Sequence, residues 1–511
     1  MNTTLKRTFE VYVFVFAFLL ASRPLSDGDF WWHLKTGEYI VRNFSIPRVD
    51  FYSFTVPGRH WVAHEWLSEV IFYLIYSRAG FNTLIFIFTV LTALAFWIVF
   101  RRTAAHPFIK GFAVLLSVWS ILPTMGVRPR TFTLLFAAIY LALLHRFVRE
   151  RETTSIWWLV PLMIVWVNLH AGYLIGLVLI GLTIVGVVLD AWFAGEKLAP
   201  HWPRLKTLAL VFIACLLVAN LNPQGPRIFV FPFEFFLSPV QQDQITDWLS
   251  PDFHQKEFFP LLLLMLLTVA AFALSPKRVR PSDLLFFLAT LYMTLKSNRH
   301  VAIFALVVGP MLADYLQRWL DTTRLARVFS DSPSTISGRR QIIFNVILLL
   351  PLIACFVKLK SVIYSPPTQE RVGVPLNAVK YLKDNSITGN TFTDPNIWGG
   401  YLIWETPSNP VYIDGRIDMY GDDFMREYLG IIRGTTRWQE PFDKYGVDLA
   451  IVSPTSLMRA QLEQSPQWQQ LYRDEMAVIF LATKRHKTAQ KSQSTERVPA
   501  FIICAFCAFC G

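Results

Sequence analysis

The feature that most constrains this chain is a series of long apolar runs that recurs from the N-terminus to about residue 360. Many of these runs approach the about 20 apolar residues that a helix needs to cross a bilayer. Only 16% of the residues are charged and the mean hydropathy is +0.39, whereas soluble domains carry about 25% charged residues. The sequence therefore predicts a polytopic α-helical membrane protein.

We predict about eleven spans, at 9–22, 82–100, 108–124, 131–147, 155–169, 173–193, 206–221, 258–274, 282–296, 300–318 and 341–358. If Trp66–Tyr76 lies along the membrane surface instead of crossing it, every later basic cluster falls in a cytoplasmic turn. The N-terminus is then cytoplasmic and the C-terminal domain extracytoplasmic, in a cell (inner or plasma) membrane. The net charge of +12 is explained by this orienting role, so nucleic acid is not an expected partner.

The first external loop, residues 23–81, opens with the run L-S-D-G-D-F-W-W. Asp27 and Asp29 stand at the end of the first span, directly before Trp31 and Trp32, whose rings favour the headgroup level. Carboxylates beside a bilayer are costly to desolvate, so they usually mark a site, a partner charge or a watery cleft. This loop is our first candidate for a catalytic loop.

Later outer turns carry several polar residues, and the positive-inside rule disfavours the basic ones among them outside the membrane. These residues are Arg128 and Arg130, Asn168 and His170, Asn222, and Arg299 and His300. Each residue alone is explained better by a helix cap or an interface anchor. Their recurrence at the level of Asp27 and Asp29 predicts a polar site at the outer membrane boundary.

Two further parts of the chain differ in composition from the apolar spans. The external loop 222–257 contains an aromatic stretch that is typical of the membrane interface. From residue 361 to 484 the chain reads as a soluble α/β domain, because helical segments alternate with short β-rich runs. Residues 485–511, with three of the five cysteines, are expected to be a disordered tail.

Within that soluble domain we expect helices at Val374–Asp384 and Ile397–Glu405 and short β-rich runs at Asn390–Asp394, Pro410–Asp414 and Val447–Ser453, closed by a hairpin at Trp468–Thr483. Asp414 and Arg416, in the run V-Y-I-D-G-R-I-D, are candidates for contacting an acceptor. A plain Asp-Gly turn, or an ion pair of Arg416 with a neighbouring aspartate, is the favoured explanation of these residues.

The sequence has no Walker, G-x-S-x-G, H-E-x-x-H or G-x-G-x-x-G motif, so soluble-type nucleotide chemistry is not indicated. Asp27 or Asp29 offers a general base for an acceptor hydroxyl. Arg128, Arg130 and Arg299 offer cations for a departing lipid phosphate. Asp27 and Asp29 are also tentative ligands for Mg²⁺ or Mn²⁺. His33, His64, His170 and His300 share no metal-ligand spacing, so a zinc site is not indicated.

An acidic first loop after a signal-anchor, a juxtamembrane segment W-L-S-E-V-I-F-Y-L-I-Y from Trp66 and an external C-terminal domain together resemble the glycosyltransferase C (GT-C) superfamily. The resemblance implies a membrane glycosyltransferase of the cell envelope that uses a polyprenyl-phosphate-linked sugar donor, with Asp27 and Asp29 as the first-loop motif. The acceptor, whether lipid, glycan or protein, stays open. The chain departs from the family pattern before Trp66, where it reads W-V-A-H-E-W in place of an H-P-P or K-P-P step. Glu65 thereby becomes an alternative catalytic carboxylate.

Two other classes of function remain as alternatives. A lipid or solute transporter or flippase would place charges in the middle of its spans and would have matching halves. A non-catalytic scaffold that presents the domain at 361–484 would tolerate alanine throughout the outer polar turns.

Overall fold

The computed structural model describes residues 3–25, 27–324, 326, 349, 352–353, 356–362 and 369–483. The chain forms two compact units, one of residues 1–50, 58–373 and 416–425 and the other of residues 51–57, 374–415 and 426–511. The first unit therefore takes residues 416–425 from the predicted C-terminal domain, and the second takes residues 51–57 from the predicted first loop. Most of the predicted span 341–358 and the predicted tail 485–511 lie outside the described residues.

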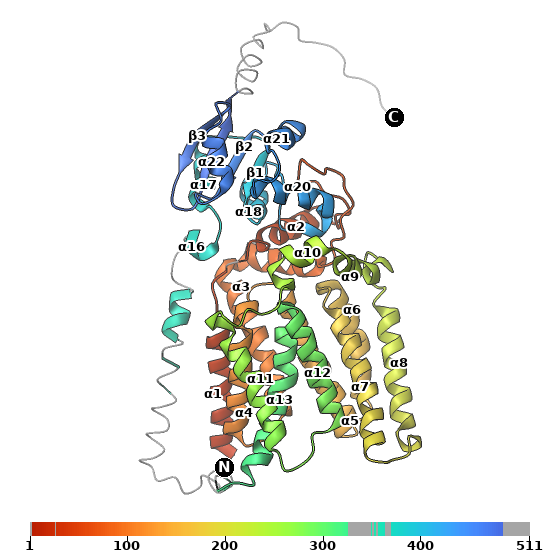
Figure 1. Ribbon diagram of the computed structural model, residues 1–511. Helices are drawn as coiled ribbons and strands as arrows, with labels where there is room; N and C mark the ends of the chain where they lie inside the picture. The colour runs from red at the N-terminus through yellow and green to blue at the C-terminus, as the bar shows by residue number, and fades with distance from the viewer. Residues whose placement is uncertain are drawn as a thin grey trace, which may run out of the picture. The chain divides into compact units, whose positions relative to one another are not determined.

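The first unit is a bundle of helices that run side by side (Figure 1). Its helices are α1 (Thr3–Ala21), α2 (Phe30–Asn43), α3 (Trp66–Arg102), α4 (Pro107–Ile121), α5 (Arg130–Arg149), α6 (Leu159–Leu169), α7 (Tyr173–Phe193), α8 (Trp202–Val218), α9 (Arg227–Leu237), α10 (Pro239–Gln244), α11 (Phe259–Leu274), α12 (Pro281–Lys296), α13 (Val301–Leu320), α16 (Gln369–Val372) and α19 (Ile417–Tyr420). Helix α20 (Asp422–Ile432) begins in this unit and ends in the second.

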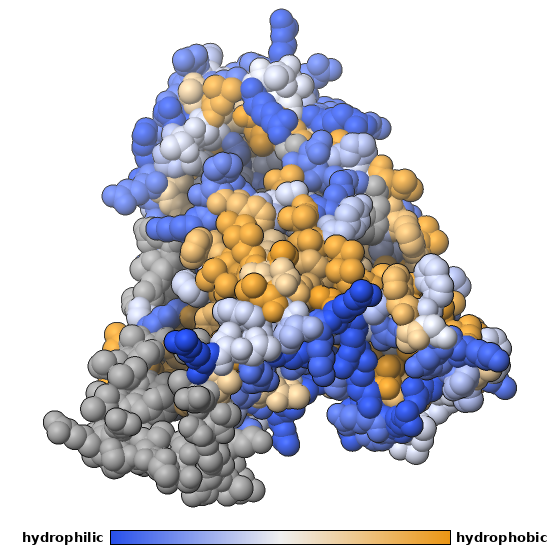
Figure 2. Space-filling view, turned by 60° about the horizontal axis from the view of Figure 1, so that its bottom comes forward, coloured by the Kyte–Doolittle hydropathy of each residue, from blue (hydrophilic) through white to orange (hydrophobic). Residues whose placement is uncertain are grey.

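Within the described chain, seven helices are long and apolar enough to cross a membrane: Trp66–Arg102, Pro107–Thr124, Arg130–Arg149, Tyr173–Phe193, Ala199–Val218, Lys256–Leu274 and Asn298–Leu320. Figure 2 shows hydrophobic residues gathered over the bundle and hydrophilic residues at its end. The prediction of a polytopic α-helical membrane protein is confirmed. The predicted spans at 9–22, 155–169 and 282–296 correspond to shorter helices, so the count of eleven stays a prediction.

Helix α3 contains both the predicted surface helix at Trp66–Tyr76 and the predicted span at 82–100. Gly80 lies between the two, with a φ of +72° that breaks the helical geometry. A residue without a Cβ adopts such a conformation at little cost. The chain can therefore change direction there without a separate loop.

Helix α2 packs closely against the first turns of α3. The rings of Phe30 and Phe72 stack with their centroids 5.8 Å apart. A Cβ atom on Gly37 would lie 2.0 Å from the backbone oxygen of Glu69, a distance that no real contact allows. Gly37 thus fixes the position of α2, which carries Asp29 at its start.

We expect Gly37→Ala to lower the stability of the first unit by about 1–3 kcal/mol, the usual cost of overpacking a well-packed contact. Thermal unfolding of the purified protein in detergent measures this effect. Gly181→Ala in α7 is the matched control, because its Cβ would meet nothing within 4 Å. Equal melting temperatures for the two variants would show that α2 and α3 are not held together in this way.

The second unit is the small α/β domain that the sequence predicts. It contains α17 (Leu376–Asp384), β1 (Thr391–Asp394), α18 (Trp398–Glu405), α21 (Gln439–Tyr445), β2 (Leu449–Val452), α22 (Leu457–Glu463), β3 (Trp468–Arg473) and β4 (Val478–Ala482). The sheet has the order β1-β2-β4-β3, with β1 parallel to β2 and the other pairs antiparallel.

The predicted hairpin at Trp468–Thr483 is confirmed by the pairing of β3 with β4. The β-rich run Pro410–Asp414 is not a strand. Among the described residues, Val411 forms isolated β-bridges to Ser53 and to Thr391. These two bridges satisfy the backbone hydrogen bonds of Val411, and its neighbours do not continue the pairing as a strand.

Candidate active site

Asp27 and Asp29 lie at the start of α2 and are held by different partners. Asp27 is buried, and its Oδ2 forms an ion pair with Nε of Arg128. Its Oδ1 accepts a hydrogen bond from the backbone N–H of Asp29 at 3.2 Å. Oδ1 of Asp29 accepts a hydrogen bond from the indole N–H of Trp32, also at 3.2 Å. Arg128 thus neutralises Asp27 and leaves Asp29 without an ion-pair partner of its own in the described chain.

The surroundings of Asp29 raise its pKa to about 7. Burial is the main cause, since it penalises the charged form, and the neighbouring charge of Asp27 adds to it. Arg128 and His33 act in the opposite direction. At neutral pH the Asp29 carboxyl is therefore divided between its protonated and ionised forms, which is the condition that suits a general base.

An arginine pair adjoins the two aspartates. Nη1 of Arg128 lies 3.1 Å from Oδ2 of Asp247, and Nη1 of Arg130 lies 2.9 Å from the same oxygen. Burial would raise the pKa of Asp247, but Arg130 and Arg128 lower it to about 2. Asp247 is therefore ionised at all physiological pH values and anchors the two guanidinium groups.

Arg299 is the cation of this cluster that has no close carboxylate. Its guanidinium lies over the ring of Trp248, 4.3 Å from the ring centroid, and its side chain is exposed. In the described part of the chain, no carboxylate lies within ion-pair distance of it. An arginine positioned by an aromatic ring and open to solvent is well suited to bind an anionic ligand.

A second cluster surrounds Glu65, the residue before α3. Oε2 of Glu65 lies 3.5 Å from Nε2 of His33, and its Oε1 lies 3.5 Å from Nε2 of His64 and 3.4 Å from Nε2 of His170. Nδ1 of His33 lies 3.2 Å from Oε1 of Glu69. Three histidines from separate segments thus converge on one nearly buried carboxylate.

The charges in this cluster shift the pKa values strongly. Burial alone would raise the pKa of Glu65, but His64, His170 and His33 hold it well below its ordinary value. Burial would lower the pKa of His64, but Glu65 is the main partner that raises it to about 9. His33 likewise has a raised pKa, because Glu69 and Glu65 outweigh its burial. The cluster therefore holds an ionised Glu65 beside protonated histidine.

His170 differs from the other two histidines. Its Nδ1 accepts a hydrogen bond from the backbone N–H of Gly172 at 2.9 Å, so its proton is assigned to Nε2, which faces Glu65. Burial lowers the pKa of His170 to about 4 despite Glu65, and Arg299 and Arg130 also lower it. His170 is thus neutral, and the arginine cluster and the Glu65 cluster lie within electrostatic reach of each other.

The other predicted site residues have structural partners. Asn222 donates to the backbone oxygen of Val167 at 3.0 Å, and His300 contacts the backbone oxygen of Met293 at 3.2 Å. Arg416 is buried in the first unit, where its Nη2 lies 2.7 Å from Asp50. Asp414 is buried in the second unit. The described contacts bring none of the four to the carboxylate clusters.

Comparison with known proteins gives matches only at the level of structure. No protein-family model and no curated protein matches the chain. The apo oligosaccharyltransferase of Archaeoglobus fulgidus aligns with a TM-score of 0.52 and 12% identity over 88% of this chain and 70% of its own. Apo ArnT from Cupriavidus metallidurans aligns with a TM-score of 0.52 and 13% identity over 94% of this chain and 98% of its own.

A third match is the arabinofuranosyltransferase AftD from Mycobacteria, with a TM-score of 0.53 and 14% identity over 94% of this chain and 42% of AftD. All three are GT-C glycosyltransferases. The chain has the GT-C fold. The resemblance noted in the sequence is thereby confirmed at the level of the fold.

Two acidic residues of this candidate site, Glu69 and Asp247, were not among the sequence candidates. Glu69 lies in the first turn of the helix predicted from Trp66, four residues after Glu65, which directly precedes that helix. The two carboxylates therefore lie close together, and this spacing was a usable signal. Asp247 lies in the loop 222–257, where nothing in the sequence distinguishes it from its polar neighbours. Oε2 of Glu69 is buried and has no hydrogen-bond partner in the described chain.

The predicted divalent cation does not fit Asp27 and Asp29 as they are arranged. Arg128 and the Asp29 N–H occupy both oxygens of Asp27, and Trp32 occupies one oxygen of Asp29, whereas Mg²⁺ and Mn²⁺ need several free oxygen ligands. Across the described residues, no group of three or more His, Cys, Asp or Glu side chains is arranged to hold a metal. We derive no step through a metal ion, and its requirement stays a prediction.

Proposed function

We propose that this chain is a membrane glycosyltransferase that moves a sugar from a polyprenyl-phosphate-linked donor to an acceptor on the extracytoplasmic face. The observation that carries the proposal is the pairing of Asp29, whose pKa is raised to about 7, with a neighbouring cluster of arginines. Group transfer from a lipid phosphate needs a base for the acceptor and cations for the departing phosphate. The arrangement at the start of α2 supplies both.

In the proposed reaction, Asp29 accepts the proton of an acceptor hydroxyl. The acceptor oxygen forms a bond to the anomeric carbon of the sugar as the bond from that carbon to the phosphate oxygen breaks. The lipid phosphate leaves with the bonding electrons, so its negative charge increases. Asp27, held by Arg128, helps to keep the proton affinity of Asp29 high.

Arg299 is the first residue that we assign to the lipid phosphate, because it is exposed and lies on Trp248 without a carboxylate partner in the described chain. Arg128 and Arg130 add positive charge but are shared with Asp247. A structural neighbour with a TM-score of 0.52 supports this class of ligand. It is the archaeal oligosaccharyltransferase AglB from A. fulgidus in complex with an inhibitory peptide and a dolichol-phosphate.

The extracytoplasmic side of the site is part of the proposal. Helices α3, α5 and α13 end at Arg102, Arg149 and Leu320, and α5 and α13 begin near Asp29, at Arg130 and Val301. Because basic residues favour the cytoplasmic end of a span, the end that carries Arg102 and Arg149 is assigned to the cytoplasm. The N-terminus is then cytoplasmic, as predicted from the sequence.

The test is to offer the purified protein in nanodiscs a panel of polyprenyl-phosphate sugars with lipid, glycan and peptide acceptors, each with and without Mg²⁺ or Mn²⁺. Mass spectrometry of the products names the sugar and the acceptor. Transfer from one donor supports the proposal, and its dependence on the added cation decides the metal prediction. Turnover of no donor favours the transporter and scaffold alternatives.

We expect kcat/KM to rise with pH through an apparent pKa near 7 and to level off above it. The rate should rise with pH because Asp29 acts as a base, and only its ionised form accepts a proton. Burial raises the pKa of Asp29 to about 7. Initial rates at low donor concentration between pH 5 and pH 9 provide the profile. A rate that falls as the pH rises through 7 would instead require Asp29 to act as an acid.

We expect Arg299→Ala to raise the KM for the donor by roughly 10-fold or more, because a charge-assisted contact to phosphate contributes about 1.5–3 kcal/mol. Arg299→Lys should restore only part of this loss, since an ammonium cannot reproduce the planar stacking on Trp248. Steady-state kinetics with the active donor measure both variants. A donor KM unchanged by Arg299→Ala would remove Arg299 from the site.

A further inference from the structure

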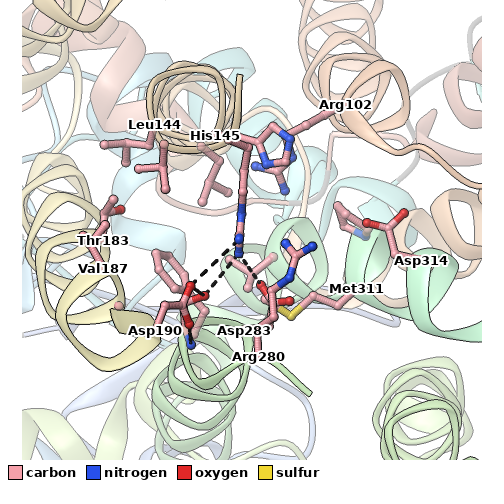
Figure 3. A pocket seen from close by; sticks show the side chains of 18 of the residues that line it. Arg102, Leu144, His145, Thr183, Val187, Asp190, Arg280, Asp283, Met311 and Asp314 are labelled. Carbon is pink, nitrogen blue, oxygen red and sulfur yellow. Dashed lines mark hydrogen bonds and ion pairs between the residues drawn. The ribbon is translucent and has the colours of Figure 1, made fainter. Parts of the chain in front are cut away.

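A polar cavity lies at the opposite end of the bundle from Asp29. Its volume is about 140 Å³, well above the roughly 10–15 Å³ that a single water needs. The lining comes from the last turns of α3, α5, α7 and α13 and the first turns of α12. Figure 3 shows Arg102, Asp190, Arg280 and Asp314 around this space.

Part of the charge in the cavity is already paired. Arg149 lies 3.5 Å from Asp283 and 3.9 Å from Asp190. Asp190 also accepts hydrogen bonds from the backbone and hydroxyl of Ser282, and Tyr315 donates to Asp283 at 2.8 Å. These contacts join α5, α7, α12 and α13 and account for two of the three aspartates.

Three arginines in the cavity remain without a close carboxylate. Arg102, Arg280 and Arg318 line the space, and in the described chain none of them has a carboxylate within ion-pair distance. Oδ1 of Asp314 is buried and lacks a hydrogen-bond partner among the described residues. Four arginines and three aspartates line the space, so the arginines outnumber the aspartates by one.

The rest of the lining is apolar. Leu144 and Val187 lie together on one side of the space, away from Arg102 and Asp314 (Figure 3). Phe286, Val307 and Met311 add further apolar surface. A cavity that combines unpaired guanidinium groups with apolar walls suits an amphiphile with a single negative charge.

We propose that this cavity binds a phospholipid, with its singly charged phosphate among Arg102, Arg280 and Arg318 and its chain against Leu144 and Val187. The positive-inside rule alone explains why arginines gather at this end, but it does not require them to face a cavity. Arg101 satisfies that rule equally well and is exposed outside the lining. The proposal does not depend on the glycosyltransferase reaction.

The test uses the full-length protein, delipidated in detergent, with dioleoylphosphatidylglycerol as the probe and native mass spectrometry and thermal unfolding as readouts. Dioleoylglycerol tests whether the phosphate is needed, and inorganic phosphate tests whether the lipid is needed. Arg102→Gln is the cavity variant. Arg101→Gln is its matched control, because it removes the same charge from the same helix end.

We expect phosphatidylglycerol to bind the wild type and Arg101→Gln alike, and Arg102→Gln to bind it roughly 10-fold more weakly. Val187→Phe, which keeps every charge and fills the apolar wall, should also weaken binding, so a folding defect in Arg102→Gln alone does not decide the result. The proposal is overturned if dioleoylglycerol or inorganic phosphate alone binds as well, or if Arg102→Gln binds like Arg101→Gln.

Discussion

Asp29→Asn is expected to lower glycosyl transfer by at least about 100-fold, since a positioned general base contributes about 10²–10⁴-fold. Asparagine keeps the shape of the side chain and its contact with Trp32 but cannot accept the acceptor's proton. Rates of product formation at pH 8, where the wild-type carboxyl is mostly ionised, measure the effect. A rate within a few fold of the wild type would mean that Asp29 is not the base. Glu65, the alternative carboxylate, would then be the candidate.

The loss of activity in Asp29→Asn should come without a loss of stability. The folded-state pKa of Asp29 is raised to about 7, so ionisation of this carboxyl opposes folding as the pH rises toward and above that value. A neutral amide removes this penalty, and the variant should melt no lower than the wild type at pH 8. Glu38→Gln on α2 is the matched control, because it makes the same chemical change in a residue that pairs with Lys35 and Arg42.

Glu65→Gln is expected to destabilise the first unit by about 3–5 kcal/mol, the cost of leaving a buried charge without its partner. The charge left behind is that of His64, whose pKa Glu65 helps to raise to about 9. Thermal or denaturant unfolding at pH 7 measures the change. Glu196→Gln is the matched control, because Glu196 also pairs with a histidine, at 2.9 Å, but is 58% exposed and should contribute at most about 1 kcal/mol.

The destabilisation of Glu65→Gln should depend on pH in a defined direction. A histidine whose folded-state pKa is raised adds stability that is fully present below its unfolded pKa and is lost as the pH rises through its folded pKa. For His64 that window runs from about 6.5 to about 9. The gap between the wild type and Glu65→Gln should therefore shrink across it. A gap that stays constant over this range would mean that Glu65 acts through packing alone.

The bundle was predictable because the length and hydropathy of a span are local properties. The run L-S-D-G-D pointed to Asp27 and Asp29 for the same reason, since carboxylates at the end of a span are unusual wherever the chain goes next. The small sheet also followed from local pattern, apart from Pro410–Asp414. The strand propensity of that run gave no hint that Val411 would find only isolated partners.

The contacts of the site were not predictable from the sequence. Arg128 forms an ion pair with Asp27, about a hundred residues earlier in the chain. His170, in the turn after α6, lies within ion-pair distance of Glu65, which is more than a hundred residues earlier. Arg416 was assigned to an acceptor site, but its partner is Asp50, far earlier in the chain. These pairings depend on how helices pack against one another, which no local pattern records.

The most direct measurement is the release of polyprenyl phosphate from the donor panel by the wild type and by Asp29→Asn, side by side at pH 8. We expect the wild type to release lipid phosphate from one donor in equal amount to the glycosylated product. Asp29→Asn should fold but release at least about 100-fold less. Equal release by the two proteins, or release by neither from any donor, would contradict this expectation.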